Sequence, residues 1–394
     1  MYSALKGLKV IEMGHVIAGP FCGGMLGDFG AEVIKVELPG AGDGLRAMGR
    51  VKDMFFAQEG RNKKCVTLNL KTEQGKEMLS KMLETADVLI ENYRPGVLAK
   101  LGFSWDRLQE INKRLIQVSV SGYGQTGPYR LRPGYDSVGM AMGGLTYVSG
   151  FKDGPPTRPG YCLGDYVTGL FAVIGTMFAV YARDVQGLGV GQIIDLSLYE
   201  SIFRLSDTMV GEYGYDGSIK GRIGNAHLAT VPSGVFQTKD DKWIVISVGN
   251  DRVFAQYAKC VGREDLLEDP RLKTQSERVK YREYLEDIAA KYIRSITLEE
   301  ALTQFEGRLP AAPVMNVEDI CNDPHYADRE DIVEIADRHF GTLKMPNAYP
   351  KMSLTPGEVR WTGPEMGEHN LEVYGNIFGY TEQDIERLQK EGII

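Results

Sequence analysis

The sequence predicts an α/β protein with a large domain on a Rossmann-like open parallel sheet and a smaller α+β domain. The first observation is a βαβ opening of about thirty residues, in which apolar runs at Leu8–Glu12 and Gly30–Leu38 flank a helical segment at Phe21–Phe29. The second is that further short apolar runs alternate with helical segments for the first half of the chain. The third is a change of composition after this half, where residues rich in Gly, Tyr and charge interrupt the alternation. Strands alternating with helices are typical of a parallel sheet covered by helices.

The remaining elements of the large domain follow from two patterns. A short apolar run predicts a buried strand, and apolar residues at helical spacing predict an amphipathic helix. Strands are expected at Asp87–Glu91, Leu115–Val120 and Gly191–Ser197. Helices are expected at Lys71–Thr85, from the turn Asn92–Gly96 through Leu101, at Ser104–Ile111 and at Tyr166–Arg183. This succession continues the alternation of the opening unit.

The domain boundaries are expected where the pattern changes. Residues 1–205 form the first part of the large domain, 206–225 a linker, 226–315 the small domain, and 316–394 a linker that returns the chain to the large domain. Within the small domain, a KDDK turn predicts a hairpin. The other elements expected after the linker are strands at Gly234–Asp241, Trp243–Val248, Ala312–Met315 and Ile332–Ile335, and helices at Val253–Lys259, Lys273–Ser295, from Asp319, and at Thr381–Glu391.

Composition excludes several classes of function. The chain of 394 residues carries 45 basic and 53 acidic residues, a net charge of −8, which disfavours nucleic acid or an anionic membrane as the main partner. Its five cysteines include no CxxC pair and its five histidines no HxxxH spacing, which disfavours a disulfide framework and a metal centre. No run reaches the ~18 uninterrupted apolar residues of a membrane span. We therefore expect a cytoplasmic protein with reduced thiols, no membrane contact and no metal.

One ionised side chain, Asp165, stands at the start of the apolar helix and has two interpretations. As a helix N-cap, its carboxylate accepts backbone N–H bonds. As a nucleophile, the same anion, with its pKa kept low by the helix dipole and these N–H groups, faces a cleft and attacks an activated acyl carbon. Asp136 and Asp195 have no neighbouring histidine or second acid that would indicate acid–base work, so the sequence predicts structural roles for both.

Three other stretches have a structural and a functional interpretation. The loop Gly14–Pro20 lacks G-x-G-x-x-G and the P-loop lysine, so it is either a tight βα turn or a ligand loop at the end of a strand. The loop Gly122–Pro128 is either a flexible turn or a wall of a ligand cleft. A cluster of basic residues is either a solvated face or a binding site for a phosphorylated ligand. It consists of Arg61, Lys63, Lys64 and Lys71, and Arg94 and Lys100 add further positive charge.

Six segments, taken together, carry a family resemblance. They are LKGLKVIEMGHVIAGPFCGGMLGDFGAEVIKVE, GRNKKCVTLNLKTEQGKE, ENYRPGVLAKLGF, SVSGYGQTGPY, RPGYDSVGMAMGGL and GDYVTGLFA. In this order they resemble the family III CoA transferases, the carnitine/bile-acid CoA-transferase superfamily. The resemblance implies a large domain built from both chain ends, a small domain between them, and two identical subunits that interlock as a homodimer.

The resemblance also implies a reaction and a set of residues. CoA moves from an acyl-CoA donor to a free carboxylic acid through an aspartyl–acyl anhydride and an aspartyl-CoA thioester, without a prosthetic group. Asp165 matches the family's catalytic aspartate. A glycine loop that shields the intermediates in formyl-CoA transferase should fall at residues 225–234, which are not a glycine run in this chain. The positions that match CoA-binding or acyl-binding residues are Val16, Ile17, Ala18, Leu68, Lys71, Asn92, Tyr93, Val97, Lys100, Leu101 and Tyr135.

Two alternatives belong to other classes of protein. An α-methylacyl-CoA racemase shares the superfamily fold, but it uses a histidine where this chain has Tyr135, and a phenol with a reference pKa near ~10 replaces an imidazole poorly. A catalytically silent CoA-binding protein would keep the fold and bind CoA but would form no covalent intermediate. The transferase is the preferred prediction.

Overall fold

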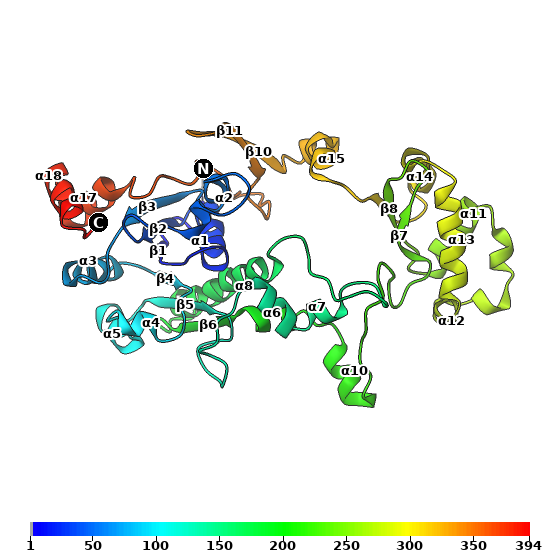
Figure 1. Cartoon of the computed structure of the whole chain (residues 1–394), viewed down its shortest axis with the longest axis horizontal. Helices are drawn as coiled ribbons and strands as arrows, with labels where there is room; N and C mark the ends of the chain where they lie inside the picture. The colour runs from blue at the N-terminus through cyan, green and yellow to red at the C-terminus, as the bar shows by residue number, and fades with distance from the viewer. Residues whose placement is uncertain (1–2) are drawn as a thin grey trace. The chain divides into compact units, whose positions relative to one another are not determined.

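The computed structural model describes residues 3–394, which divide into two compact units (Figure 1). The first unit comprises the chain up to Thr146, together with Arg158–Gly217 and His325–Ile394. The second comprises Tyr147–Thr157 and Ser218–Pro324. The first unit therefore joins the two chain ends, and a short excursion at Tyr147–Thr157 belongs to the second unit although it precedes the predicted linker.

The first unit is built on a six-stranded sheet in which every pair of neighbouring strands is parallel. Its order, β3-β2-β1-β4-β5-β6, is that of a Rossmann fold, with a switch between β1 and β4. The strands are β1 (Lys9–Glu12), β2 (Glu32–Glu37), β3 (Lys63–Thr67), β4 (Val88–Glu91), β5 (Ile116–Ser121) and β6 (Ile193–Ser197). The predicted α/β class and parallel sheet are confirmed. The sequence missed β3, because its two lysines were interpreted as part of a surface cluster.

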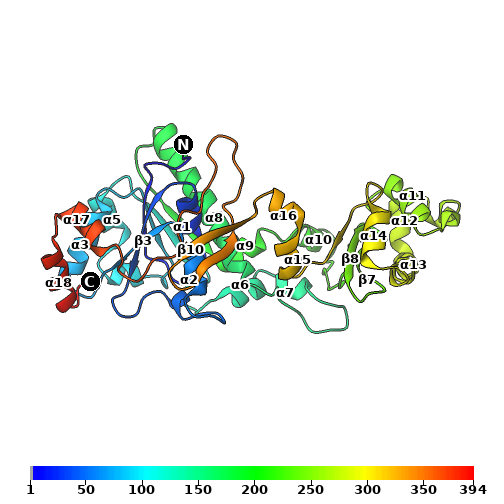
Figure 2. The ribbon, with the colours of Figure 1, turned by 90° about the horizontal axis from the view of Figure 1, so that it is seen from above.

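Helices cover both faces of this sheet because successive strand side chains point to opposite faces. Val10, Val33 and Val88 pack on one face against α1 (Ala18–Asp28) and α8 (Leu163–Val180). The neighbouring side chains on these strands pack on the other face against α3 (Glu73–Leu83), α5 (Trp105–Ile111), α17 (Asn370–Phe378) and α18 (Glu382–Lys390). Figure 2 shows β3 between the two groups of helices. The C-terminal helices thus complete a core that the first hundred residues begin.

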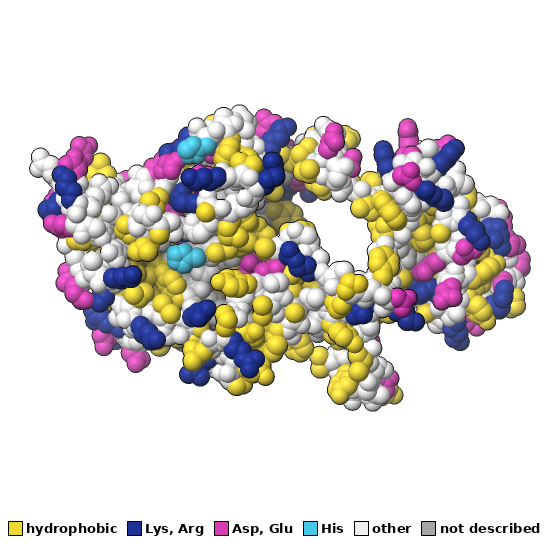
Figure 3. All heavy atoms as spheres, in the orientation of Figure 1, with side chains coloured by type: hydrophobic (Ala, Val, Ile, Leu, Met, Phe, Trp, Pro, Cys, Tyr) yellow, Lys and Arg dark blue, Asp and Glu magenta, His cyan; other side chains and the backbone are white. Residues whose placement is uncertain are grey.

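Several shorter elements complete the first unit. They are the 3-10 turn η1 (Gly44–Arg46), the helices α2 (Met54–Glu59), α4 (Val97–Lys100), α6 (Asp136–Met142), α9 (Leu198–Phe203) and α10 (Met209–Asp216), the π turn η2 (Tyr181–Val185), and the antiparallel pair β10 (Ile332–Asp337) and β11 (Gly341–Pro346). Helices α7 (Leu145–Val148) and α16 (Pro324–Asp328) lie at the boundaries of the units. Part of the predicted linker is therefore the helix α10, where Figure 3 shows hydrophobic side chains on the surface. Tyr213 and Tyr215 of this helix are exposed.

The second unit is a three-stranded antiparallel sheet with helices packed against it. The predicted hairpin is present as β7 (Ser233–Gln237) and β8 (Trp243–Ser247), and β9 (Ala311–Pro313) pairs with β8. The helical elements are α11 (Asp251–Cys260), η3 (Glu264–Leu267), η4 (Pro270–Leu272), α12 (Gln275–Lys280), α13 (Arg282–Arg294), α14 (Leu298–Phe305) and α15 (Val317–Asn322). Their apolar faces and the sheet form a separate core, so the unit has the α+β composition that the sequence predicts.

Within residues 3–394, one helical segment is long and apolar enough to cross a membrane by those two criteria. It is Leu163–Val185, which contains α8, and it has a hydropathy of 1.6 with 39% of its most apolar window buried. Its buried residues are small, among them Gly164, Thr168 and Ala172. Small side chains let the helix lie close to α1 and to the sheet, and Gly169 marks the closest approach, because a Cβ there would lie 3.0 Å from the Ala18 carbonyl oxygen.

Candidate active site

A cavity of about 260 Å³ opens at the carboxyl ends of the central strands, where parallel sheets bind their ligands. Loops that directly follow three strands line it: the loop after β1, the loop after β4 and the loop after β5. Asp165 contributes from the first turn of α8. The lining residues are His15, Val16, Ile17, Ala18, Asn92, Val120, Ser121, Gly122, Gly134, Tyr135, Asp165 and Leu198.

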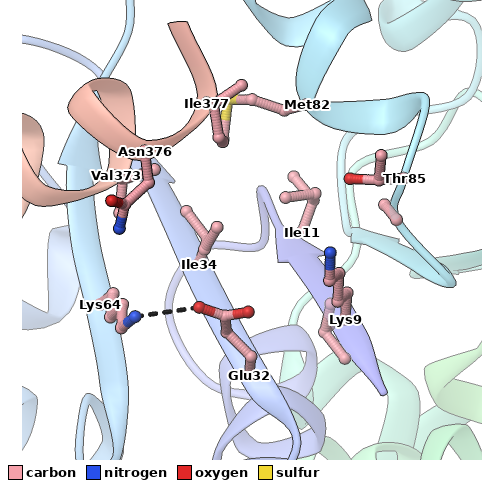
Figure 4. Close-up of a pocket in the computed structure, with 12 residues that line it drawn as sticks. Lys9, Ile11, Glu32, Ile34, Lys64, Met82, Thr85, Val373, Asn376 and Ile377 are labelled. Carbon is pink, nitrogen blue, oxygen red and sulfur yellow. Dashed lines mark hydrogen bonds and ion pairs between the residues drawn. The ribbon is translucent and has the colours of Figure 1, made fainter. Parts of the chain in front are cut away.

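Another cavity, of about 280 Å³, lies at the amino ends of the strands, between α3 and α17 (Figure 4). Lys9 and Glu32 begin β1 and β2, and the floor is apolar, with Ile11 and Ile34. Its Lys64 is already paired with Glu32, at 2.9 Å. Its one carboxylate, Glu32, is thus held in an ion pair, and the cavity lies at the opposite end of the strands from Asp165. The candidate site is therefore the cavity at the carboxyl ends.

The structure corrects the predicted cap of α8. Asp165 lies inside the first turn of the helix, and its carboxylate caps nothing. The cap comes from Asp136 at the start of α6, whose Oδ1 accepts the N–H groups of Gly164 (2.8 Å) and Asp165 (3.3 Å). The Asp165 side chain is therefore left free to face the cavity, and the prediction that Asp136 has no second acid beside it is wrong.

The predicted electrostatics of Asp165 are also wrong. Burial and the nearby charge of Asp136 raise the pKa of Asp165 to about 7, whereas the sequence analysis expected the helix to hold it low. The helix start does not dominate because Asp136 already occupies its N–H groups with a negative charge. Near neutral pH a substantial fraction of the side chain is ionised, and that anion is poorly solvated. These are the properties of a reactive carboxylate.

The loop after β1 is held by side chains at almost every backbone polar group. Asn92 brackets His15, accepting its N–H at 2.7 Å and donating to its carbonyl at 2.7 Å. Asp43 accepts the N–H of Val16 at 3.0 Å, and Lys35 donates to the carbonyl of Gly14 at 2.8 Å. The loop is therefore rigid before any ligand binds. The loop is thus a tight turn that also lines the cavity, and its role as a ligand loop stays a prediction.

Val16 occupies a strained conformation in this loop. Its φ of 67° lies in the left-handed region, which is unfavourable for a β-branched residue. Asp43, which holds its N–H, is itself paired with Lys35 at 2.7 Å. Burial alone would lower the pKa of Lys35, but Glu12 and Asp43 together raise it above its usual value. The conformation of Val16 thus depends on a buried ion network. Such strain is most often found at functional sites.

The basic cluster is not a free surface for phosphate. Lys63 is fully buried and pairs with Glu12 at 2.8 Å. Arg61 pairs with Asp28 at 2.6 Å, and Lys64 with both Glu32 and Glu372. These three residues support the sheet and its C-terminal helices. Of the cluster, only Lys71 is exposed and outside any ion pair in the described chain.

The cavity at the carboxyl ends gathers six of the predicted site residues: Val16, Ile17, Ala18, Asn92, Tyr135 and Asp165. Tyr93 lines an adjoining cavity of about 160 Å³, which shares Asn92 and Tyr135 with the first. The other five, Leu68, Lys71, Val97, Lys100 and Leu101, line neither cavity. The Leu68 side chain is in the core, with 2% of its surface exposed, so only its backbone could contact a ligand.

Sequence reasoning missed four residues at the site. His15, a lone histidine in the loop after β1, lines the cavity, and burial and Lys35 lower its pKa. Asp136 is 28 positions from the N–H that it accepts, and Asp43 is 27 from Val16, so no local pattern shows either contact. Cys162 completes a group in which one ligand atom each of Asp136, Cys162 and Asp165 lies within 4.8 Å of the others. In this group, Asp136 Oδ1 already accepts two backbone N–H groups. The absence of a bound metal stays a prediction.

Comparison with known proteins identifies the fold and the family. The model of CoA-transferase family III matches residues 5–370. The chain is 42% identical over 398 residues to the beta subunit of succinyl-CoA–L-malate CoA-transferase of Chloroflexus aurantiacus, which covers 99% of this chain and 98% of that protein. It is 38% identical over 395 residues to succinyl-CoA–D-citramalate CoA-transferase of the same organism, again covering 99% and 98%. In both relatives the match is essentially end to end.

A solved structure supports the same conclusion. The crystal structure of a CAIB/BAIF family protein from Brucella suis superposes with a TM-score of 0.85 at 30% identity, covering 96% of this chain and 100% of that one. The resemblance predicted from the six segments is therefore confirmed, with a family match that spans most of the sequence. The chain belongs to CoA-transferase family III.

Proposed function

We propose that this CoA transferase works by nucleophilic catalysis, with the Asp165 carboxylate as the nucleophile. The observation that carries the proposal is the state of that side chain: it is partly buried, it lines the cavity at the carboxyl ends of the strands, and its pKa is raised to about 7. A carboxylate with a raised pKa is more basic than an ordinary one and is poorly solvated, and both properties favour attack on a thioester.

The steps conserve charge without an external acid or base. The Asp165 carboxylate attacks the donor's thioester carbonyl, and CoA leaves as a thiolate, which gives a mixed anhydride. The thiolate attacks the Asp165 acyl carbon, the donor acid leaves as a carboxylate, and an aspartyl-CoA thioester remains. The acceptor carboxylate attacks this thioester and expels the thiolate. The thiolate then attacks the acceptor's acyl carbon, which restores the Asp165 carboxylate and releases the new acyl-CoA.

The neighbouring residues have supporting roles in this proposal. Val16, Ile17 and Ala18 hold the thioester end of CoA, and Asn92 fixes their loop. Tyr93 contacts the CoA chain, and Tyr135 the acyl group. The exposed Lys71 and Lys100 are proposed to bind the phosphates, and Leu68, Val97 and Leu101 to border the nucleotide.

The relatives suggest the class of substrate. Both Chloroflexus aurantiacus enzymes are named for succinyl-CoA as donor, and their acceptors, L-malate and D-citramalate, are dicarboxylic acids. We propose succinyl-CoA as the donor here and a dicarboxylic acid as the acceptor. We keep the prediction that the loop at residues 225–234 shields the intermediates from water.

Trapping the covalent intermediate tests the mechanism. The protein is incubated with succinyl-CoA, acid-quenched and digested, and the peptide containing Asp165 is examined by mass spectrometry. We expect the mass of CoA on this peptide, and its loss with hydroxylamine or borohydride. Asp165→Asn should show neither adduct nor turnover, whereas the control Asp106→Asn, at an exposed carboxyl in α5, should behave as wild type. An Asp165→Asn protein that transfers CoA at the wild-type rate would exclude the mechanism.

The same preparation separates the transferase from the racemase. A chiral 2-methylacyl-CoA in deuterated water should show no exchange at its α carbon. Exchange at the rate of turnover would favour proton abstraction over acyl transfer.

We also propose that two copies of the chain form a homodimer, and α8 provides the support. This helix buries its small residues and leaves its large apolar ones exposed: Leu170 by 42%, Ile174 by 44% and Phe178 by 71%. These three recur every four residues and so form one stripe. An apolar stripe on a surface marks an interaction site, and a second copy is the partner that the family resemblance implies.

A further inference from the structure

Cys162 places a second nucleophilic atom beside the proposed nucleophile. It is the N-cap residue of α8, just before the turn that carries Asp165, and it is partly buried. Its Sγ, one carboxylate oxygen of Asp165 and one of Asp136 all lie within 4.8 Å of one another. An acyl group bonded to the Asp165 oxygen would therefore lie next to a thiol that is always present, and such proximity strongly favours a reaction between the two.

The position of Cys162 is one that usually makes a thiol reactive. A cysteine at the start of a helix generally has a lowered pKa, because the free N–H groups there stabilise the thiolate. Arg158, in the segment that leads into α8, adds a positive charge that acts in the same direction. The chain thus brings two features that favour a thiolate close to the carboxylate that would carry the acyl group.

Asp136 opposes both features. Its Oδ1 accepts the N–H groups of Gly164 at 2.8 Å and Asp165 at 3.3 Å, so the helix start faces a negative charge instead of offering free donors. Burial, together with the charges of Asp136 and Asp165, raises the pKa of the Cys162 thiol although Arg158 lowers it. The thiol is therefore held protonated, and a protonated thiol is a weak nucleophile.

The charge of Asp136 matters most while Asp165 carries an acyl group. The free Asp165 carboxylate also repels a thiolate, but its negative charge disappears once an anhydride forms on it. Of the two carboxylates grouped with Cys162, Asp136 alone then stays negative. The protection of the acyl group thus depends on Asp136 during the step in which that group is open to attack.

We propose, on the basis of the transferase function above, that Asp136 protects the acyl intermediate on Asp165 from capture by the Cys162 thiol. In the capture, the sulfur attacks the succinyl carbonyl carbon of the anhydride, and the bond from that carbon to the Asp165 oxygen breaks. Its electron pair returns to the Asp165 carboxylate, which takes up the proton that the thiol loses, so no other reactant is needed. The product is a succinyl thioester of Cys162, which occupies the space beside Asp165 and slows the next turnover.

The test follows this capture in Asp136→Asn, which keeps an oxygen for the N–H groups of α8 and removes the charge. Exchange between succinyl-CoA and isotopically labelled succinate measures turnover without an assumed acceptor, and fragment spectra of the digested protein assign any succinyl group to Cys162. We expect a constant exchange rate in the wild type and a falling rate in Asp136→Asn. The variant should carry about 10-fold more succinyl on Cys162, because removing a neighbouring negative charge lowers the pKa of a thiol.

Further variants separate the charge from other effects of the substitution. Asp136→Glu retains the carboxylate and should keep Cys162 free of succinyl, whereas Asp136→Ser, whose hydroxyl is also a cap acceptor, should behave as Asp136→Asn and provides a second neutral variant. Adding Cys162→Ala to Asp136→Asn should restore a constant rate. Adding Cys321→Ala, which removes the exposed cysteine of α15, is the matched control and should not restore it.

Three results would overturn the proposal. The first is a wild-type protein with as much succinyl on Cys162 as the neutral variants. The second is a falling rate in Asp136→Asn that persists after Cys162→Ala is added. The third is neutral variants, folded by circular dichroism, that turn over with a constant rate and an unmodified Cys162.

Failure of the transferase function would look different. The wild type would then show neither a CoA adduct on Asp165 nor exchange between succinyl-CoA and succinate. Failure of the protective role alone would leave both of these intact and change only what happens at Cys162.

Discussion

At the scale of single residues, the central feature is a pair of aspartates with different tasks. Asp136 is buried and caps α8 through Oδ1, and Asp165 lies in the first turn of that helix with its carboxylate free. The charge of Asp136 helps to raise the pKa of Asp165 to about 7. Two acids whose environments differ in this way divide the work between support and reaction.

The pH dependence of the reaction follows from this pair. Only the ionised form of Asp165 attacks, so kcat/KM should fall as the pH drops through about 7 and level off above it. In Asp136→Asn, the amide oxygen still caps the helix but the negative charge is gone. Burial remains the larger cause of the shift, so we expect the acid limb to move down by about 0.5–1.5 pH units without reaching the value of a free aspartate.

The measurement is a profile of kcat/KM for succinyl-CoA from pH 5 to 9 for wild type, Asp136→Asn and the surface control Asp106→Asn. The control should reproduce the wild-type limb. An unchanged limb in Asp136→Asn, with its fold intact by circular dichroism, would show that Asp136 does not tune the nucleophile.

At the scale of elements, the loop after β1 is fixed by contacts that no single segment contains. Its φ of 67° at Val16 costs about 1–2 kcal/mol for a residue with a Cβ, and the Asp43 hydrogen bond compensates this cost. Lys35 holds Asp43 from β2, and Glu12 of β1 holds Lys35. The geometry of the active-site loop is therefore set by charges buried in the sheet beneath it.

A double-mutant cycle tests this dependence. Asp43→Ala should lower kcat/KM about 10- to 100-fold, because Val16 can then relax out of the left-handed region. Glycine adopts that region without strain, so Val16→Gly should restore about 5- to 10-fold of the lost activity when combined with Asp43→Ala. The melting temperature of each variant is recorded beside its kinetics. Losses that simply add, with no recovery in the double variant, would contradict the role given to the Val16 conformation.

Elements also show where sequence reasoning succeeded and where it failed. Strands β1, β2, β4 and β5 carry short apolar runs, and these patterns placed them correctly. β3 begins with Lys63, whose charge suggested a surface, although Glu12 neutralises it inside the fold. The helix α8 was predicted, but its cap was assigned to the local Asp165 because the true cap, Asp136, is distant in sequence. Local patterns predict elements well, whereas long-range pairing of buried charges is visible only in three dimensions.

The same difference between local patterns and long-range contacts applies to the candidate site. The proposed nucleophile, Asp165, and the loop residues Val16, Ile17, Ala18 and Asn92 were predicted through the family's motifs, and the structure places them around one cavity. The environment of the nucleophile was not predictable, because its pKa depends on burial and on a residue 29 positions away.

At the scale of the whole molecule, the exposed apolar stripe of α8 is the feature that a single chain leaves unexplained. The helix is apolar enough to pass for a membrane span, but its small-residue face packs on α1 and on the sheet of the first unit. If its large side chains were exposed in solution, the protein would carry an aggregation-prone surface. A second copy that covers the stripe removes this problem, and symmetric homodimers are the most common assembly of soluble proteins.

Light scattering coupled to size-exclusion chromatography tests this assembly. Wild type should elute as a single species with twice the 43.7 kDa mass of the chain, independent of concentration in the micromolar range. Ile174→Lys combined with Phe178→Lys places two charges in the stripe, so it should yield monomer or insoluble protein, because buried like charges without partners oppose association. Leu354→Lys, at a leucine that is 84% exposed outside α8, is the control and should stay dimeric. A wild-type protein that elutes as a monomer, or a double variant that dimerises normally, would mean that the stripe of α8 is not the interface.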